Sequence, residues 1–411
     1  MSSKSVAAFS LLTAQAVRSR AERMLALGEA GELPNFRVDL TRLDATANLV
    51  IATMRKAYPA LDVPFHSRWR HFCIDGEDRY AAIERRPGVR DRATRARAAF
   101  DLAIVSVLLD AGAGPQWRYR DGATGKDIGR SEGLALASLD MFTRGAFSAD
   151  PRDPLRADAA VLGTLTSQAL RDGFQVGDKN PLVGLDGRAA LLRALGERAA
   201  ANPDVFGRND SPRPGGLFDH LAALAQNGAI PAPVILAEIL RQLGPIWPSR
   251  LTLDGVALGD CWKHPSMVTT DSTSELVPLH KLSQWLSYSL IEPLQQAGLT
   301  VTDLDGLTGL AEYRNGGLFV DTAVLTLRDP AAAQREHDVG STLVVEWRAL
   351  TVALLDRLAQ AVRAKLNMDA AALPLAKVLE GGSWAAGRAI ARSLRPDGSS
   401  PIKVISDGTV F

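Results

Sequence analysis

The side chains best suited to chemistry gather in one stretch of the chain, residues 245–321. It contains the runs GDCWKHP (259–265), HKLSQW (280–285) and LTGLAEYRNGGLFVD (307–321). Three of the seven tryptophans and two of the six histidines lie in this stretch, interleaved with acidic and basic residues. Aromatic walls with a few convergent polar groups are what a small-molecule pocket requires. The pattern therefore predicts a binding pocket in this part of the chain.

The usual cofactor signatures are missing from the sequence. It has no Walker A loop, no G-x-G-x-x-G motif after a strand, no H-E-x-x-H and no G-x-S-x-G. We therefore expect no cofactor and no bound metal. One alternative stays open, because Asp260, Cys261 and His264 are residue types that bind zinc. Three mixed ligands on one loop favour such a site only weakly.

Four runs carry a resemblance that covers essentially the whole chain. They are VPFHSRWRHF (63–72), GDCWKHP (259–265), VPLHKLSQWL (277–286) and LTGLAEYRNGGLFVD (307–321). Together they resemble the uracil-catabolism protein four family of fungi and bacteria. The resemblance implies a role in degrading uracil after its conversion to the ribonucleotide. A relative of GTP cyclohydrolase is thought to open the ring in that pathway, which yields urea and a three-carbon acid.

A more distant resemblance concerns about 35 residues. Lys281-x-x-Gln284, followed by Leu307-Thr308-x-x-x-Glu312-Tyr313-Arg314, is similar to motifs of the queuosine-salvage N-glycosidases. Those enzymes cleave a base from a ribose 5-phosphate, and their helical fold is related to helix-hairpin-helix DNA glycosylases. The acid at the position of Glu312 is treated there as catalytic. This chain departs from the pattern with Glu instead of Asp, and with Asn-Gly-Gly instead of Val-Pro-Gln after the arginine.

The resemblance implies cleavage of an N-glycosidic bond, with a urea-bearing ribose 5-phosphate as substrate. Such cleavage passes through an oxocarbenium-like transition state, which a nearby carboxylate stabilises. The nitrogen leaving group needs a proton or strong hydrogen bonds. The expected catalytic residues are Glu312 for the sugar cation and Asp260 and His264 for the leaving group. The expected substrate-binding residues are Lys281, His280 and Arg314 for the phosphate, Trp262 and Trp285 as walls, and Asn315, Tyr313 and Asp321.

Several of these residues also have a purely structural interpretation. Trp285 has the spacing of a core position on a helix, and His264 before a proline suits the cap of a turn. Gly316-Gly317 after Asn315 suits a turn with positive φ. Both interpretations of each residue remain open at the level of sequence.

Two other function classes also remain open. One is a non-enzymatic nucleotide-sensing or scaffold protein of the same pathway, and the other is a metal-dependent ureide or amide hydrolase. An enzyme should place Glu312, Lys281 and Asp260 in one concave site, whereas a scaffold should show a large apolar surface patch.

The elements that position these residues are predicted to be mostly helices. Apolar residues recur at helical spacing from Val344 to Leu366, with Arg348 among the polar positions between them, and 94–110 is apolar nearly all round. The sequence predicts a mainly α fold of two closely packed helical lobes. These are residues 1–205, with a hairpin near 117–128, and residues 206–411, which carry the site. Further short strands are expected near 319–327 and 402–405, and the loop-rich stretch 202–216 is the expected boundary. The more distant resemblance implies a helix-hairpin-helix core.

Composition limits the partners. The chain has 411 residues, a formal net charge of +1 and 46% hydrophobic residues, so a large core and no nucleic-acid partner are expected. No stretch reaches the length of an apolar membrane span, and two cysteines suit a reducing cytoplasm. Basic residues in the N-terminal segment are compatible with a transit peptide, but Glu22 and Glu29 favour a first helix of the fold. The expected partner is a small nucleotide-derived substrate, and a homodimer is compatible with the sequence.

Overall fold

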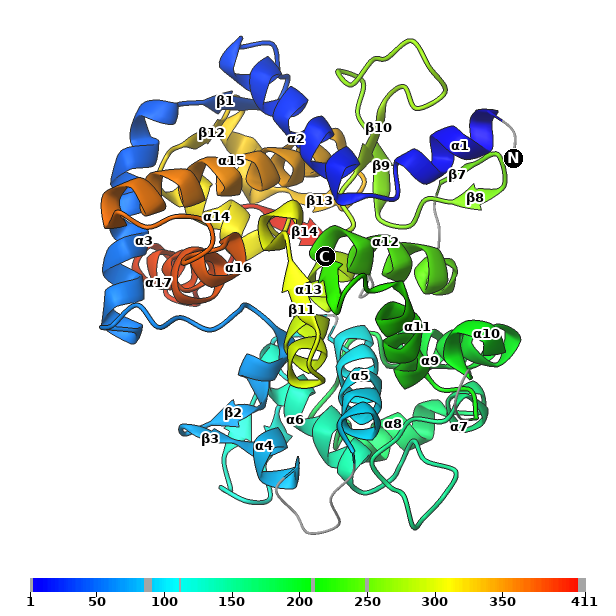
Figure 1. Ribbon diagram of the computed structural model, residues 1–411. Helices are drawn as coiled ribbons and strands as arrows, with labels where there is room; N and C mark the ends of the chain where they lie inside the picture. The colour runs from blue at the N-terminus through cyan, green and yellow to red at the C-terminus, as the bar shows by residue number, and fades with distance from the viewer. Residues whose placement is uncertain (1–2, 85–90, 111, 208–210, 248–250, 406–411) are drawn as a thin grey trace.

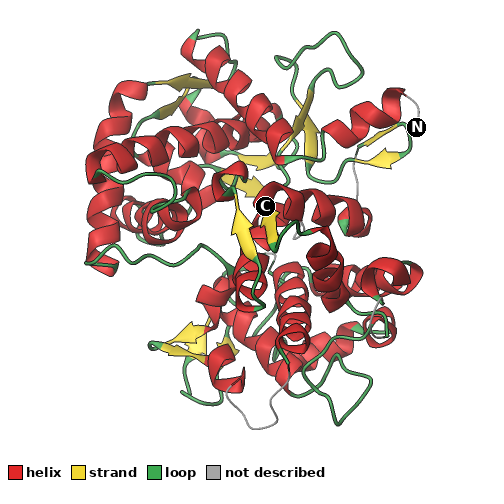
Figure 2. Cartoon of the chain, in the orientation of Figure 1, coloured by secondary structure: helices red, strands yellow, loops and turns green. Residues whose placement is uncertain are grey.

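The computed structural model describes residues 3–84, 91–110, 112–207, 211–247 and 251–405. Helices of all types contain 56% of the described residues, which confirms the mainly α fold (Figure 2). The strands of the described residues form only two-stranded pairs. A helix-hairpin-helix core stays a prediction. Among the described residues, none of the helices is both long enough and apolar enough to cross a membrane.

The helices are short on average, with one long exception. The α-helices are α1 (Ser3–Ser10), α2 (Ala14–Glu29), α3 (Leu43–Ala57), α4 (Arg79–Glu84), α5 (Arg92–Leu108), α6 (Arg130–Thr143), α7 (Ala159–Gly163), α8 (Ser167–Gly173), α9 (Leu185–Ala201), α10 (Pro203–Phe206), α11 (Leu217–Leu224), α12 (Ala232–Gln242), α13 (Lys281–Gln296), α14 (Tyr313–Asp321), α15 (Thr342–Leu366), α16 (Leu375–Val378) and α17 (Trp384–Leu394). A π-helical turn, η7 (Leu379–Ser383), joins α16 to α17.

The strand pairs are a minor part of the fold. Antiparallel pairs are β1 (Phe36–Val38) with β12 (Leu325–Leu327), β2 (Cys73–Ile74) with β3 (Glu77–Asp78), β4 (Tyr119–Arg120) with β5 (Asp127–Ile128), β7 (Thr252–Leu253) with β8 (Val256–Ala257), and β9 (Cys261–Lys263) with β10 (Leu276–Pro278). Parallel pairs are β6 (Ala229–Pro231) with β11 (Thr300–Thr302) and β13 (Glu336–Asp338) with β14 (Lys403–Ile405). The predicted hairpin near 117–128 and the strand near 402–405 are confirmed. The other pairs were not predicted from the sequence.

Segments near the N-terminus pack against helices and strands of the C-terminal part of the chain. Helices α2 and α3 pack against α15, and β1 pairs with β12, so that Phe36 lies opposite Leu327 (Figure 1). Arg18 of α2 forms an ion pair with Asp356 of α15 at 2.8 Å, which makes α2 a helix of the fold. The N-terminal segment thus belongs with the C-terminal helices, and α5, α6, α8 and α9 form the other part of the molecule. The division into lobes of residues 1–205 and 206–411 stays a prediction.

The long helix α15 forms because its apolar residues recur at three-to-four spacing and its start is capped. Ser341 accepts a hydrogen bond from the backbone N–H of Val344, and the helix ends at Asn367, which has a φ of 53°. Its core positions include Trp347 and Leu350, both at most 1% exposed. Arg348, expected on the polar face, is also 1% exposed. The helix is therefore buried nearly all round in its first half, and its arginine needs a buried partner.

The expected strand at 319–327 is correct only in part, and the expected turn with positive φ at Gly316-Gly317 is wrong. Only Leu325–Leu327 is strand, and both glycines lie inside helix α14 without positive φ. Their small size serves packing instead. A Cβ on Gly316 would lie 2.8 Å from the Trp347 indole, whose N–H donates to the Gly316 carbonyl at 3.0 Å. The glycine therefore lets α14 approach α15 closely.

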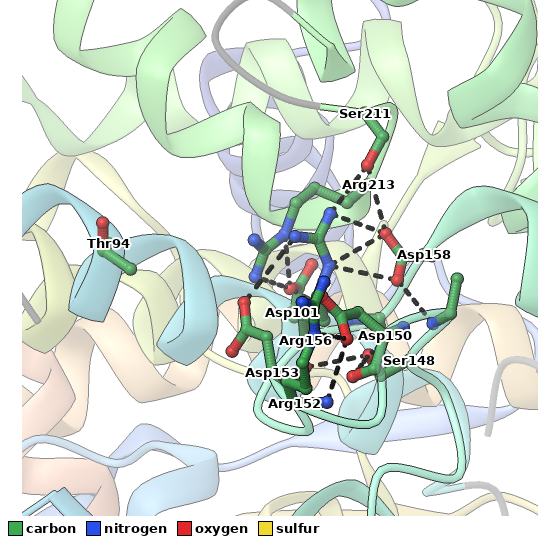
Figure 3. Close-up of polar contacts among 12 residues, drawn as sticks. Thr94, Asp101, Ser148, Asp150, Arg152, Asp153, Arg156, Asp158, Ser211 and Arg213 are labelled. Carbon is green, nitrogen blue, oxygen red and sulfur yellow. Dashed lines mark hydrogen bonds and ion pairs between the residues drawn. The ribbon is translucent and has the colours of Figure 1, made fainter. Parts of the chain in front are cut away.

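The segment predicted as a boundary is anchored to helix α5 by a buried ion network (Figure 3). The Arg213 guanidinium donates to the Asp101 carboxylate of α5 at 2.8 Å, and the pair is at most 3% exposed. Asp101 also accepts the backbone N–H groups of Ala157 at 3.0 Å and Gly215 at 2.6 Å. One carboxylate thus ties two loops to a single helix. Buried charges require this kind of full pairing.

Candidate functional site

A cleft of about 460 Å³ opens where several helices begin. Its wall includes the first residues of α6, α13 and α14, part of α17, the segment around His66 and His71, and the loop 397–400. Small-molecule pockets commonly measure roughly 300–1,000 Å³. The polar and aromatic lining comprises His66, His71, Asp110, Arg130, Ser131, Glu132, Lys281, Trp285, Glu312, Tyr313, Arg314, Trp384, Arg388, Asp397, Ser399 and Ser400. The cleft therefore has the size and the chemistry to bind a small polar molecule.

Gln284 and Thr308 hold the two motif runs against each other. The Gln284 amide donates to the Thr308 hydroxyl at 2.7 Å and accepts the Thr308 backbone N–H at 3.3 Å. The Tyr288 hydroxyl donates to the Thr308 carbonyl at 2.9 Å. Because Gln284 lies one turn after Lys281, these bonds bring the start of α13 next to the segment that leads into Glu312. The two motif runs, far apart in the sequence, are thus in direct contact beside the cleft.

Glu312 is the N-cap residue of α14, and its side chain lines the cleft. Its two carboxylate oxygens accept the backbone N–H groups of Asn315 at 2.6 Å and Arg314 at 2.7 Å. The residue is 8% exposed. Burial raises the pKa of Glu312, while the two N–H donors and the charge of Lys281 act in the opposite direction. The helix therefore fixes a poorly solvated carboxylate in one orientation.

Lys281 lies at the start of α13 on the same cleft wall. Its ammonium group forms neither a hydrogen bond nor an ion pair with any described residue. Burial lowers the pKa of Lys281, and the carboxylates of Glu312 and Asp110 offset part of that effect. Burial also raises the pKa of Asp110, which lies 3.2 Å from the Arg68 guanidinium. The Lys281 charge thus interacts electrostatically with the carboxylates of Glu312 and Asp110, without a hydrogen bond or an ion pair to either.

His66 and His71, which line the cleft, come from the run VPFHSRWRHF. His66 Nδ1 lies 2.6 Å from the Glu380 carboxylate on the π-helical turn η7. The centroid of the His66 ring lies 6.4 Å from that of Trp285 and 6.1 Å from that of Trp384. A carboxylate partner fixes the ring orientation and the proton on Nδ1, which leaves Nε2 for a ligand. Single π-turns are common at functional sites.

Asp260, an expected catalytic residue, is committed to structural contacts and does not line the cleft. Its carboxylate receives two hydrogen bonds from Arg348 at 2.8 Å each, one from Trp262 Nε1 at 2.6 Å and one from the Lys281 backbone N–H at 2.9 Å. Burial alone would raise the pKa of Asp260, but the Arg348 charge and these donors lower it to about 2. Arg348 also donates to the Ala311 carbonyl at 3.2 Å. The pair therefore fixes the backbone of Lys281 and that of Ala311, the residue before Glu312.

Besides Asn315, four other expected residues also lie outside the cleft lining. The buried His264 ring lies 3.3 Å from Glu346, the Trp262 indole is bonded to Asp260, and Asp321 binds Arg395 through both oxygens. His280 Nε2 lies 3.0 Å from the Leu11 carbonyl, and this side chain borders a separate space of about 20 Å³. That space is about one water molecule in size. Of the residues expected to bind substrate, the structure brings Lys281, Arg314, Trp285 and Tyr313 to the cleft, together with Glu312.

Asn315 lies beneath the cleft rather than on its wall. Its backbone N–H donates to Glu312, and its side-chain oxygen accepts a hydrogen bond from Ser383 at 2.8 Å. Asn315 therefore joins the start of α14 to the π-helical turn that carries Glu380. Its position indicates that Asn315 helps to hold Glu312 in place.

The alternative metal ligands do not converge in the structure. Asp260 is paired with Arg348, His264 lies against Glu346, and burial raises the pKa of Cys261 to about 12. Among the described residues, no group of three histidine, cysteine, aspartate or glutamate side chains is arranged to hold a metal ion. The loop 259–265 thus uses Asp260 to bind Arg348.

The cleft residues that were not predicted from the sequence include His66, Asp110, Arg130, Trp384 and Arg388. They come from four segments far apart in the chain and form no local motif. Only His66 had a usable signal, because it lies in one of the four runs that carried the family resemblance. The other four reach the cleft through tertiary packing alone.

The chain is similar to known proteins along its whole length. A family model described as "Protein of unknown function (DUF1688)" matches residues 10–411. The protein named Protein urg3 of Schizosaccharomyces pombe is 40% identical over 421 residues, covering 100% of both chains. The protein named Uracil catabolism protein 4 of Lachancea kluyveri is 38% identical over 413 residues, covering 93% of both chains.

Proposed function

Because the chain belongs to the DUF1688 family and one full-length relative is named for uracil catabolism, we propose that it acts in uracil degradation as an N-glycosidase-type hydrolase. The resemblance noted from the four sequence runs is confirmed by these relatives. The proposed substrate is a urea-bearing ribose 5-phosphate derived from ring-opened UMP. The proposed products are urea and ribose 5-phosphate.

One observation carries the proposal: Glu312 and Lys281 line the same cleft, with Glu312 held by two backbone N–H groups. A fixed, poorly solvated carboxylate interacts strongly with a developing sugar cation and needs no reorganisation during the reaction. Trp285 and Trp384 supply apolar walls that exclude water from such a site. This arrangement suits cleavage of a bond whose transition state carries positive charge.

In the proposed reaction, the bond between the anomeric carbon and the urea nitrogen breaks, and its electron pair stays on the nitrogen. His66, oriented by Glu380, gives a proton from Nε2 to that nitrogen, so urea leaves neutral. Water then adds to the sugar cation beside Glu312, and the proton that it loses passes to His66, which replaces the proton given to the urea nitrogen. One water is consumed, and ribose 5-phosphate and urea are formed.

Neither rival function is favoured by an observation of comparable weight. A scaffold should carry a large apolar patch, yet few large apolar residues of the described chain are exposed: Val6, Val183, Leu224, Val268, Tyr313, Leu394 and Ile405. A metallohydrolase needs convergent ligands, and the loop 259–265 directs Asp260 to Arg348 instead.

The proposal is tested by incubating the purified protein with N-ribosylurea 5-phosphate in the presence of EDTA. Equimolar urea and ribose 5-phosphate should appear. Activity that is lost in EDTA and restored by zinc would favour the metallohydrolase. Absence of any turnover, with tight binding retained, would favour a nucleotide sensor.

The dependence of turnover on pH should reflect the ionisation of Glu312. Because burial raises the pKa of this carboxyl, turnover should fall, as the pH is lowered, at a higher pH than for an exposed glutamate. The Lys281 charge favours ionised Glu312, so Lys281→Met should raise the pKa of Glu312 further and move the acid limb of kcat upward.

The control for this profile is Lys263→Met, since Lys263 is an exposed lysine of β9 outside the cleft lining. It should leave the acid limb where it is in the wild type. An acid limb in the Lys281→Met variant that stays fixed or moves to lower pH would show that Lys281 does not act on the essential carboxyl.

A further inference from the structure

Three arginines of the cleft lining lie near one another. Arg130 begins α6, Arg314 lies in the first turn of α14, and Arg388 lies on α17, and all three line the cleft. Burial and then the charges of Arg314 and Arg388 lower the pKa of Arg130. Like charges this close repel each other. A cluster of this kind is stabilised when an anion binds between its members.

The cluster is only partly neutralised by the protein. Arg388 pairs with Glu132 at 2.8 Å, and Arg314 donates one hydrogen bond to the Gly398 carbonyl at 2.8 Å. The Arg130 guanidinium has no hydrogen bond and no ion pair among the described residues. The carboxylate of Asp397, another residue of the cleft lining, accepts a hydrogen bond from the backbone N–H of Ser399 at 2.9 Å. Donor groups therefore remain for a ligand.

The backbone around Arg130 adds to the same site. Its φ of 59° lies in the left-handed region, which is unfavourable for a residue with a Cβ. The backbone N–H groups of Ser131 and Glu132, in the first turn of α6, have no partner among the described residues. Free amides at a helix start favour an anion. Strained backbone, free amides and three guanidinium groups thus belong to residues that line the cleft.

We propose that Arg130, Arg314 and Arg388 form the subsite for the 5-phosphate of the substrate. This inference rests on the proposed function for the identity of the ligand. A guanidinium suits a phosphomonoester because its N–H groups match two phosphate oxygens at once. Lys281 interacts with Glu312 and Asp110 instead, so the phosphate lies beside the three arginines and the anomeric carbon lies beside Glu312.

The subsite is tested by calorimetric titration with ribose 5-phosphate and with ribose, using Arg130→Met. Methionine keeps the length of the side chain and the positive φ, and it removes the charge. Ribose 5-phosphate should bind about tenfold more weakly, the lower range for one charge-assisted hydrogen bond at an exposed position. Ribose should bind as it does to the wild type. The matched control is Arg392→Met, an exposed arginine that acts on Arg130 but does not line the cleft, and it should change binding less than twofold.

The outcomes separate this inference from the proposed function. Equal losses in the Arg130 and Arg392 variants, or equal losses for both ligands, would overturn the subsite even if the wild type releases urea. A selective loss of ribose 5-phosphate binding would support the subsite even if no urea is released. Thermal unfolding of both variants shows whether the fold is intact.

Discussion

Replacing Glu312 with glutamine should lower turnover by about 10²–10³, the usual cost of removing one preorganised electrostatic group. Glutamine keeps the size of the side chain and can still accept one of the two backbone N–H bonds that Glu312 accepts. It removes the charge that would face the sugar cation. Since that charge matters most in the transition state, kcat should fall more than the affinity for ribose 5-phosphate. The measurement is steady-state kinetics beside titration with the product.

A capping defect must be separated from the loss of charge, because Glu312 begins helix α14. Loss of a cap costs about 0.5–2 kcal/mol of stability. The control is Asp91→Ala, which removes the cap of α5 on an exposed part of the molecule. It should lower stability and leave kcat unchanged. Glu312→Asp should keep partial activity, since it restores the acid of the queuosine-salvage motif. Wild-type turnover in Glu312→Gln would contradict any role for this charge.

Removing either member of the Asp260–Arg348 pair should lower the free energy of unfolding by about 3–5 kcal/mol, because it leaves one buried charge unpaired. The side chains are 8% and 1% exposed, and both carboxylate oxygens are bonded to the guanidinium. Asp260→Ala and Arg348→Met are compared by chemical denaturation. The double variant should lose less than the sum of the single variants, because no lone charge remains.

An exposed pair of the same residue types supplies the control. Asp329 and Arg335 are 2.7 Å apart and each 58% exposed, so breaking that pair should cost less than about 1 kcal/mol. If Asp260→Ala costs no more than Asp329→Ala, the Asp260–Arg348 pair does not brace the cleft. The same variants bear on catalysis, since Asp260 fixes the Lys281 backbone and Arg348 fixes Ala311.

Periodicity predicted the helices because burial follows the helical repeat. Helices α5 and α15 lie within a few residues of the expected 94–110 and 344–366. The same reasoning failed for Arg348, which the repeat placed on the polar face. Its partner Asp260 lies 88 residues earlier in the chain, and an ion pair of that separation leaves no local pattern. Asp260 therefore looked available for catalysis when it was already paired.

Motif resemblance predicted the centre of the site better than its edges. Glu312, Lys281, Arg314, Trp285 and Tyr313 reach the cleft, because Gln284 and Thr308 dock the two motif runs. The role of Gly316-Gly317 was predicted wrongly, because the sequence alone does not distinguish a glycine that permits close helix packing from a glycine in a turn. Arg130, Asp110 and Arg388 were missed because only the fold brings them together.

The proposed function requires that the bond between the sugar and the urea nitrogen breaks, and that it breaks beside Glu312. It is tested most directly by NMR with N-ribosylurea 5-phosphate whose urea group carries ¹³C and ¹⁵N. The wild type should release intact labelled urea in equimolar amount with ribose 5-phosphate, and Glu312→Gln should not do so on the same timescale. Labelled bicarbonate and ammonium, or equal release of urea by Glu312→Gln, would contradict it.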